Sequence, residues 1–269
     1  MTDGVRAVCK WCKSPNDPSA ASCSSCGAPL SGAELVSDSG WREAPRLRDM
    51  TEIGFGTGSV IQVDGEIVPV ADITLTAADA VFFEHHALLW KDEAVPMSVA
   101  QTAGGGMGRL FGGMPFVMTF ATGPGRIAFS RDGTGELVVL PMPPNTEIDV
   151  RGHSFLLASH TLKYQFEKIK GFRNVLHGGE MYMDEFHSTD WPGVLVLHGF
   201  GNVFERTLGA GESIMVEPGA FLYKDGSVTM NVEQQDLKTG MFGRSGLWLA
   251  RMTGPGRIGI QSMYHHHGD

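Results

Sequence analysis

Four cysteines near the start of the chain have the spacing of a metal site. Cys9 and Cys12 form one C-x2-C pair, and Cys23 and Cys26 form a second pair ten residues later. Each pair can turn two thiolates to one side of a tight knuckle, and two such knuckles make the tetrahedral sulfur site that Zn²⁺ prefers. We therefore predict a structural zinc ribbon in residues 1–30, whose metal supplies most of the folding energy of so small a segment.

The residues around the cysteine pairs support the same interpretation. The second knuckle continues as Gly27-Ala28-Pro29-Leu30, and glycine suits the positive φ that a knuckle demands. This text resembles the short zinc-ribbon module found at the start of many bacterial proteins, although Lys13 stands where that module often has glycine. Two disulfides or a redox dithiol are the alternatives, but a redox dithiol is normally a single C-x-x-C within a βαβ pattern.

The remaining polar residues match no catalytic pattern. His85 and His86 are adjacent and would point to opposite faces of a strand, so they lack the H-x-H spacing of a barrel metal site. Asp184, Glu185 and His187 could do acid–base work, but a solvated loop explains them more simply. No G-x-S-x-G nucleophile motif is present. We therefore expect no catalytic residues.

Arginines near the glycine-rich turns are candidate contacts for an anion. Two of them follow Gly-Pro-Gly turns and two lie upstream, and a guanidinium pair can grip an anion with two donors at once. The four are Arg109, Arg126, Arg244 and Arg257. Asn202 takes the matching place in the middle of the chain, which weakens this prediction.

A glycine-rich segment at residues 104–113 is the second candidate contact region. It lacks the G-K-[S/T] and G-x-G-x-x-G patterns of phosphate-binding loops, so a surface connection is the simpler interpretation. Its apolar tip could instead touch a partner or a membrane surface. The tip residues are Met107, Leu110 and Phe111.

The chain beyond residue 49 has the pattern of an all-β domain. Short apolar or alternating runs recur there, separated by Gly, Pro, Asp and Asn. The best candidate for a helix is residues 98–103. Each Gly-Pro-Gly turn joins two apolar runs and is expected to be type II, with proline second and glycine third.

Three copies of one pattern recur in this domain. The first recurring segment starts at Glu84, Arg151 and Glu217 in the three copies, and these starts are 67 and 66 residues apart. The text FVMTFATGPGRI at 116–127 returns as LWLARMTGPGRI at 247–258, with a degenerate middle copy, VLVLHGFGNV. Such self-similarity indicates tandem β units that share one core around a pseudo-threefold axis.

These motifs resemble the "altered inheritance of mitochondria, protein 24" family over residues 50–264. The resemblance implies a tandem triplication of a shortened double-stranded β-helix unit, grouped in fold with the tryptophan RNA-binding attenuation protein. The mitochondrial member is tied to inner-membrane organisation, and no reaction is established for bacterial members. The family therefore supplies no catalytic residues for this chain.

Composition bounds the remaining possibilities. The chain has 269 residues and 42% hydrophobic residues, enough for a real core, and no apolar run long enough for a membrane helix. The net charge of −9 and the pI near 5.5 disfavour DNA and RNA as partners. The start lacks a signal segment, so we expect a cytoplasmic protein. We divide it into a ribbon at 1–30, a linker at 31–48, the triplicated domain at 49–264 and a tail at 265–269 that contains His265–His267.

The function expected from these features is that of a non-enzymatic binding or assembly scaffold. The ribbon would dock a protein partner, and the β domain would form a platform, with a homo-oligomer as one form of assembly. One alternative is a small-ligand-binding or enzymatic barrel that brings His85, His153 or His198 into one pocket. The other is a module that contacts RNA or a membrane surface without crossing the membrane.

Overall fold

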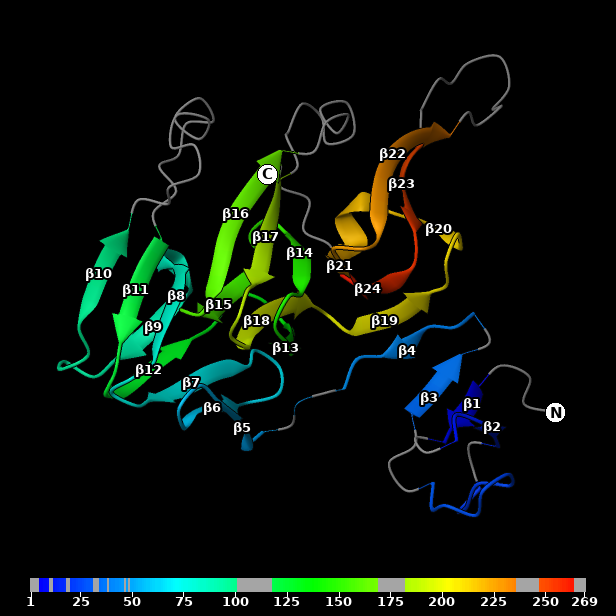
Figure 1. Ribbon diagram of the computed structural model, residues 1–269, viewed down its shortest axis with the longest axis horizontal. Helices are drawn as coiled ribbons and strands as arrows, with labels where there is room; N and C mark the ends of the chain where they lie inside the picture. The colour runs from blue at the N-terminus through cyan, green and yellow to red at the C-terminus, as the bar shows by residue number, and fades with distance from the viewer. Residues whose placement is uncertain are drawn as a thin grey trace.

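Three copies of a six-stranded unit follow one another in the computed structural model (Figure 1). Repeat 1 contains β7 (Val70–Leu75), β8 (Ala80–Glu84), β9 (Leu88–Lys91), β10 (Met97–Ala100), β11 (Met118–Thr122) and β12 (Gly125–Phe129). Repeat 2 contains β13 (Gly135–Met142), β14 (Glu147–Arg151), β15 (Phe155–Ser159), β16 (Leu162–Lys168), β17 (Tyr182–Ser188) and β18 (Gly193–Phe200). Repeat 3 contains β19 (Val203–Leu208), β20 (Ser213–Val216), β21 (Phe221–Asp225), β22 (Thr229–Gln235), β23 (Leu247–Thr253) and β24 (Gly256–Gln261). The structure describes residues 5–9, 12–17, 20–30, 34–37, 39–45, 47, 49–100, 118–168, 182–235 and 247–263.

The same pairing pattern occurs in every repeat. The sixth strand pairs with the first and third strands, and the fifth strand pairs with the second and fourth, always antiparallel. The ladder between the third and sixth strands also shifts register at the same place in all three copies. A bulge at the same place in all three copies is a regular feature of the repeating unit rather than an irregularity of one copy. The prediction of an all-β, triplicated domain is therefore confirmed.

Each repeat is joined to the next through one pair of strands. The second strand of repeat 1, β8, pairs with the third strand of repeat 2, β15, so that Phe83 lies opposite Leu157. The equivalent strands β14 and β21 join repeats 2 and 3, with Val150 opposite Tyr223. We call these contacts joint 1 and joint 2. Figure 1 shows repeats 1 and 3 at opposite ends of the domain, with repeat 2 between them.

The strands form because their side chains alternate between a core and a second surface. In β6 (Ser59–Asp64) every second side chain is buried, as expected for a sheet with one covered face. All five residues of β15 are buried, since Phe155 and Ala158 belong to one hydrophobic core cluster and Leu156 and Leu157 to another. The rings of Phe82, Phe155 and Phe186 pack together, and the centroids of Phe155 and Phe186 are 5.0 Å apart. Joint 1 is thus a core contact and not a surface contact.

The two Gly-Pro-Gly turns differ from the predicted type II geometry. Both Gly–Pro bonds are cis, so each proline takes the third rather than the second position of its turn. The first glycine lies too close to a neighbouring backbone for a side chain: a Cβ on Gly123 would lie 2.1 Å from Thr76 O. A Cβ on Gly254 would likewise lie only 2.5 Å from Gly209 O. The repeated glycines therefore serve the packing of strands.

Three short strands near the start of the chain form a small sheet, and a fourth strand pairs with repeat 3. The ribbon sheet has the order β2 (Pro15–Asn16), β1 (Val5–Val8) and β3 (Glu34–Ser37). Strand β4 (Arg42–Glu43) then pairs with β19, and Arg42 Nη2 lies 3.1 Å from Glu205 Oε2. The segment assigned to a linker, 31–48, thus contains two short strands. Strand β5 (Thr51–Phe55) and β6 extend the sheet of repeat 1.

The one predicted helix is absent at its described residues. Residues 97–100 form strand β10, which pairs with β11 over its whole length, so tertiary pairing overrides the local preference. Residues 101–103 lie outside the described part of the chain. Short 3₁₀ turns at His85–Ala87 and Pro218–Ala220 form the corners of repeats 1 and 3. Within the described ranges, no helix has the length and apolar character needed to span a membrane.

Candidate functional site

The four cysteine side chains converge at the tip of the ribbon. Their four Sγ atoms all lie within 4.8 Å of one another. Cys9 Sγ is 3.7 Å from Cys26 Sγ, and Cys12 Sγ is 3.6 Å from Cys23 Sγ, so each contact joins one knuckle to the other. All four thiols are free, and Cys9 and Cys23 are buried. The four cysteines could therefore bind a metal ion together.

The backbone builds the two knuckles in the same way. Lys13 N donates to Cys9 O at 2.9 Å, and Gly27 N donates to Cys23 O at 2.9 Å. Both residues that follow the second cysteine of a pair have a left-handed φ, 61° at Lys13 and 73° at Gly27. Lysine thus occupies a position that glycine fills at lower cost, which explains why the similar module often has glycine there.

Hydrogen bonds to sulfur favour thiolates in this cluster. The side-chain and backbone hydrogen bonds from Ser14 lower the pKa of Cys12 to about 6. A backbone hydrogen bond from Cys26 is the main cause that lowers the pKa of Cys23, and Ser25 N and Asn16 Nδ2 also donate to Cys23 Sγ. A backbone hydrogen bond from Ala28 lowers the pKa of Cys26, but contacts with the other thiols and burial outweigh it and raise the value to about 12. Thiolates are the form that binds metal.

A second polar cluster lies at the corner where repeat 1 meets repeat 2. Glu84 ends β8, and its side chain is only 3% exposed. Its Oε2 atom is 2.9 Å from His86 Nε2, in the 3₁₀ turn that follows, and 3.7 Å from His153 Nδ1, in repeat 2. The Arg131 guanidinium contacts His86 Nε2 and His153 O, and its Nη2 lies 3.8 Å from Glu84 Oε2. We call Glu84, His86 and His153 the corner cluster.

Within the corner cluster, Glu84 and His153 each shift the pKa of the other. Burial alone would raise the pKa of Glu84, but His153 and His86 outweigh it and lower the pKa to about 2. The contact with Glu84 raises the pKa of His153. The pKa of Arg131 is lowered by its burial. Glu84 is therefore a buried carboxylate whose charge requires cationic neighbours.

The histidines named for a possible pocket do not all meet. His153 belongs to the corner cluster, and it lines a cavity of about 160 Å³ with Arg131 and Arg151. His85 is exposed, and His86 takes its place beside Glu84. His198 is buried against Phe200, and burial followed by the charge of Arg131 lowers its pKa to about 4. The cavity is small compared with pockets of ~300–1,000 Å³ that hold drug-sized ligands.

Sequence reasoning missed the corner cluster because of a local error. The prediction that His85 and His86 lie in a strand is wrong, because a 3₁₀ turn covers residues 85–87 and directs His86 back to Glu84. A signal was available in the repeat alignment. His86 and His153 occupy the same position in their repeats, two residues after Glu84 and Arg151.

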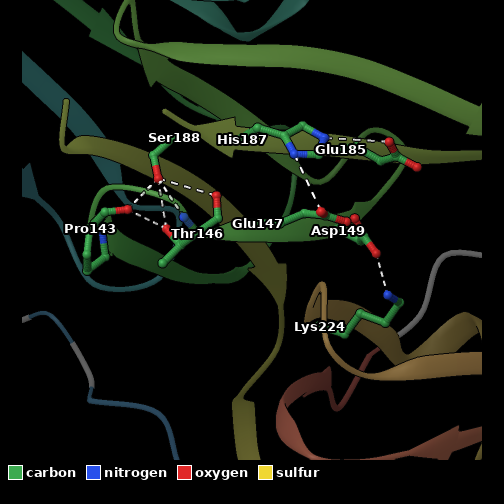
Figure 2. Close-up of polar contacts among 8 residues, drawn as sticks. All are labelled: Pro143, Thr146, Glu147, Asp149, Glu185, His187, Ser188 and Lys224. Atoms are coloured by element: carbon green, nitrogen blue, oxygen red, sulfur yellow. Dashed lines mark hydrogen bonds and ion pairs between the residues drawn. The ribbon is translucent and has the colours of Figure 1, made fainter. Parts of the chain in front are cut away.

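A third polar group lies on the strands of repeat 2 and at joint 2 (Figure 2). His187 lies between two carboxylates, with Nδ1 3.5 Å from Glu147 Oε2 and Nε2 3.7 Å from Glu185 Oε2. These residues belong to strands β14 and β17 and not to the loop that the sequence indicated. Figure 2 also shows the buried ion pair between Asp149 and Lys224, which crosses joint 2.

The predicted arginine contacts are held by carboxylates where the structure describes them. Arg126 Nη2 is 2.6 Å from Asp72 Oδ2, and Arg257 Nη2 is 3.3 Å from Asp225 Oδ1. They lie in two different sheets, in repeat 1 and repeat 3. Arg257 also lines a groove of about 500 Å³, together with Glu147 and Asp225. Arg109, Arg244 and the apolar tip at Met107, Leu110 and Phe111 lie outside the described residues.

The fold and the thiol cluster define a class of protein: a triplicated all-β domain that follows a four-cysteine module. Residues 61–263 match the AIM24 family, described as mitochondrial biogenesis AIM24, and the chain belongs to that family. The resemblance noted from the repeats is thus confirmed, and the four cysteines lie outside the matched segment.

One solved structure shares the fold over most of its length. It is protein SPYM3_0169 from Streptococcus pyogenes, determined by X-ray crystallography. The two chains superpose with a TM-score of 0.61 and 17% identity, over 77% of this chain and 94% of that chain. No curated protein matches this sequence.

Proposed function

We propose that this protein is a non-enzymatic assembly scaffold. Its triplicated β domain joins further copies of itself edge to edge, and its N-terminal ribbon, folded around Zn²⁺, docks a protein partner. The observation that carries this proposal is a difference in burial between equivalent residues of the three repeats.

The third strand of each repeat shows this difference most clearly. In repeats 2 and 3 the neighbouring repeat covers this strand, and Leu156, Leu157, Leu222 and Tyr223 are all 0% exposed. In repeat 1 the equivalent strand is β9, where Leu89 is 56% exposed and Trp90 is 40% exposed. Strand β9 ends its sheet and pairs only with β12 among the described residues. An apolar strand edge of this kind is a template for pairing with another strand.

The complementary edge is present at the other end of the domain. Strand β20 is the equivalent of β8 and β14, which make the two joints, and it also ends its sheet. Ile214 and Met215 are half-buried, whereas Val81, Phe82 and Ile148 at the matching positions are buried. Figure 1 places β9 in the left part of the domain and β20 in its right part.

The two joints also define the register expected between copies. Their pairing aligns Phe83 with Leu157 and Val150 with Tyr223. Transferred to the free edges, the same register sets Val216 of one copy opposite Trp90 of the next and Met215 opposite Lys91. Such a head-to-tail contact uses two different surfaces, and it therefore builds rings or filaments of several copies.

Zinc fits the geometry of the ribbon thiols. Zn–S bonds of ~2.3 Å in a tetrahedron separate the sulfur atoms by ~3.8 Å. The Sγ separations across the knuckles, 3.6 and 3.7 Å, agree with that value. A site with four protein ligands is closed, so the metal would be structural, and a reducing cytoplasm would keep the thiols available for it. The ribbon would then present a rigid surface beside repeat 3.

The test of assembly is the native mass of the full chain, measured by light scattering over a range of concentrations. We expect an oligomer, and we expect Leu89→Lys to shift it to the single-chain mass of 29.0 kDa, because a charge would have to be buried in the new joint. Trp191→Lys is the matched control, since Trp191 is 71% exposed and lies on neither edge. A wild-type protein of single-chain mass at every concentration would refute the proposal.

Partner docking by the ribbon requires a separate measurement. A pull-down with the full chain should retain a protein that is lost with the variant Cys9→Ser/Cys23→Ser, in which the thiol cluster is broken. The Leu89→Lys variant should still retain it. Equal retention by the wild-type chain and the cysteine variant would remove the docking role and leave the assembly role intact.

A further inference from the structure

We propose that the corner cluster binds a divalent transition-metal ion, Zn²⁺ first among them, through Glu84, His86 and His153. This site is distinct from the ribbon thiols and links repeat 1 to repeat 2. Two imidazole nitrogens and one carboxylate oxygen are a ligand set typical of such ions and not of Mg²⁺ or Ca²⁺, which prefer oxygen.

The donor atoms have the spacing of ligands around one ion. Glu84 Oε2, His86 Nε2 and His153 Nδ1 all lie within 4.8 Å of one another. The distances of 2.9 and 3.7 Å from Oε2 to the two nitrogens bracket the ~3.0–3.4 Å that separates neighbouring ligands at ~2.1 Å from a metal. The three atoms can therefore share an ion with small side-chain adjustments.

The carboxylate is the second observation that indicates a ligand. The side chain of Glu84 is only 3% exposed. Neither of its carboxylate oxygens accepts a well-aligned hydrogen bond within the described structure. His86 Nε2 is close at 2.9 Å but lies outside hydrogen-bond geometry. A buried carboxylate in this state is costly unless a cation completes its surroundings.

Arg131 is the competing cation in this corner. Its Nη2 lies 3.8 Å from Glu84 Oε2, and its guanidinium also contacts His86 Nε2. The same guanidinium donates to the backbone oxygens of His153 and Phe155, contacts that do not depend on the carboxylate. A metal ion would displace Arg131 only from the carboxylate and His86, while its backbone contacts would remain.

The site is specific to joint 1. The position of His86 and His153 is occupied by Gly219 in repeat 3, and Arg151 stands where repeat 1 has Glu84. At joint 2 Arg151 instead donates to Gly219 O. His153 keeps a left-handed φ of 67°, a conformation that glycine adopts at lower cost.

The experiment counts zinc per chain after dialysis against micromolar Zn²⁺. All proteins carry alanines in place of His265–His267, so that this run binds no metal. We expect two ions per wild-type chain and one for His153→Gly, because His153→Gly removes a ligand but relieves the strained backbone and should not unfold the protein. His86→Ala should also lose one ion. His85→Ala is the matched control and should keep two.

A second readout separates metal binding from folding. Added Zn²⁺ should raise the melting temperature of a protein whose ribbon is already loaded, since the corner ion binds only the folded joint. His153→Gly should melt no lower than the wild-type protein without added zinc and should lose the zinc-dependent rise. The proposal is overturned if the wild-type chain and His153→Gly hold the same number of ions.

Discussion

At the scale of single residues, Lys13 and Gly27 perform the same task in the two knuckles of the ribbon. Each follows a C-x2-C pair, each donates its N–H to the first cysteine of that pair, and each has a positive φ. A side chain in this region of backbone space costs ~1–2 kcal/mol relative to glycine. The first knuckle is therefore the weaker half of the proposed metal site.

This difference predicts that Lys13→Gly tightens zinc binding by the ribbon. A gain of about 1 kcal/mol corresponds to roughly a fivefold increase in affinity, which a competition titration with a chelator can measure. Gly27→Ala is the matched control and should weaken binding. A Cβ at Gly27 meets no atom within 4 Å, so the cost comes only from the strained backbone conformation of alanine at this φ. An unchanged affinity for Lys13→Gly would show that the first knuckle carries no strain.

The Asp79 carboxylate connects the turn between β5 and β6 to the end of β7. Its carboxylate accepts hydrogen bonds from Thr57 N at 2.9 Å, Ser59 Oγ at 2.6 Å and Thr76 Oγ1 at 3.0 Å. Burial would raise its pKa, but these hydrogen bonds, with Ser59 first, lower it below the ordinary aspartate value. The ionised form thus stabilises the fold at pH above the unfolded pKa, and this stabilisation is lost as the pH falls through the folded pKa.

We therefore expect Asp79→Asn to destabilise the protein by about 1–3 kcal/mol at neutral pH. The difference in unfolding free energy between the variant and the wild-type protein should shrink as the pH falls below about 4, since the Asp79 carboxylate of the unfolded chain is then protonated while that of the folded chain is still charged. Urea titrations at several pH values measure it. A difference that stays constant into the acid range would contradict the assigned role.

Residue types alone could predict the ribbon site but not the corner cluster. The C-x2-C spacing fixes which side chains meet, because each pair lies within one tight turn. Glu84 and His153 are 69 residues apart, and their contact depends on how repeat 1 docks on repeat 2. Only the repeat register, which equates His86 with His153, contained information about that contact.

At the scale of elements, the two joints solve the same packing problem with different chemistry. Phe82 and Ala158 are paired at joint 1, and Asp149 and Lys224 are paired at the equivalent positions of joint 2. The Asp149–Lys224 ion pair is buried on both sides, with each side chain 6% exposed. Apolar residues can therefore take these positions without loss of the strand pairing.

The ion pair predicts non-additive effects of substitution at joint 2. Lys224→Met leaves Asp149 buried without its partner and should cost about 3–5 kcal/mol in unfolding free energy. The double variant Asp149→Leu/Lys224→Met should recover most of that loss, because both charges are removed together. Urea unfolding of the two variants measures the coupling. Equal destabilisation by the single and double variants would contradict this account.

The sequence predicted most elements because their apolar runs and turns repeat three times. It failed where a partner strand decides the structure. Residues 98–100 belong to a strand because they pair with β11. The shape of the first Gly-Pro-Gly turn depends on the close approach of Gly123 to Thr76 O. Neither contact is visible in a local window of sequence.

At the scale of the whole molecule, the domain is an array of three units with two joints and two free edges. Each repeat offers one second strand and one third strand, and the chain uses two of the three possible pairs. The two strands that take part in neither joint, β20 and β9, carry apolar residues at positions that are buried in the equivalent strands of the other repeats. The proposed assembly therefore requires that these two edges meet between chains.

Cross-linking through engineered cysteines tests this claim most directly. One chain carries Lys91→Cys and a second carries Met215→Cys, which the transferred register places opposite each other. We predict that mild oxidation of an equal mixture links the two chains through these two engineered positions, and that either variant alone gives no link through its engineered cysteine. The double variant in one chain should give linked chains rather than an internal bridge. Absence of the mixed pair, or an internal bridge only, would contradict assembly through β9 and β20.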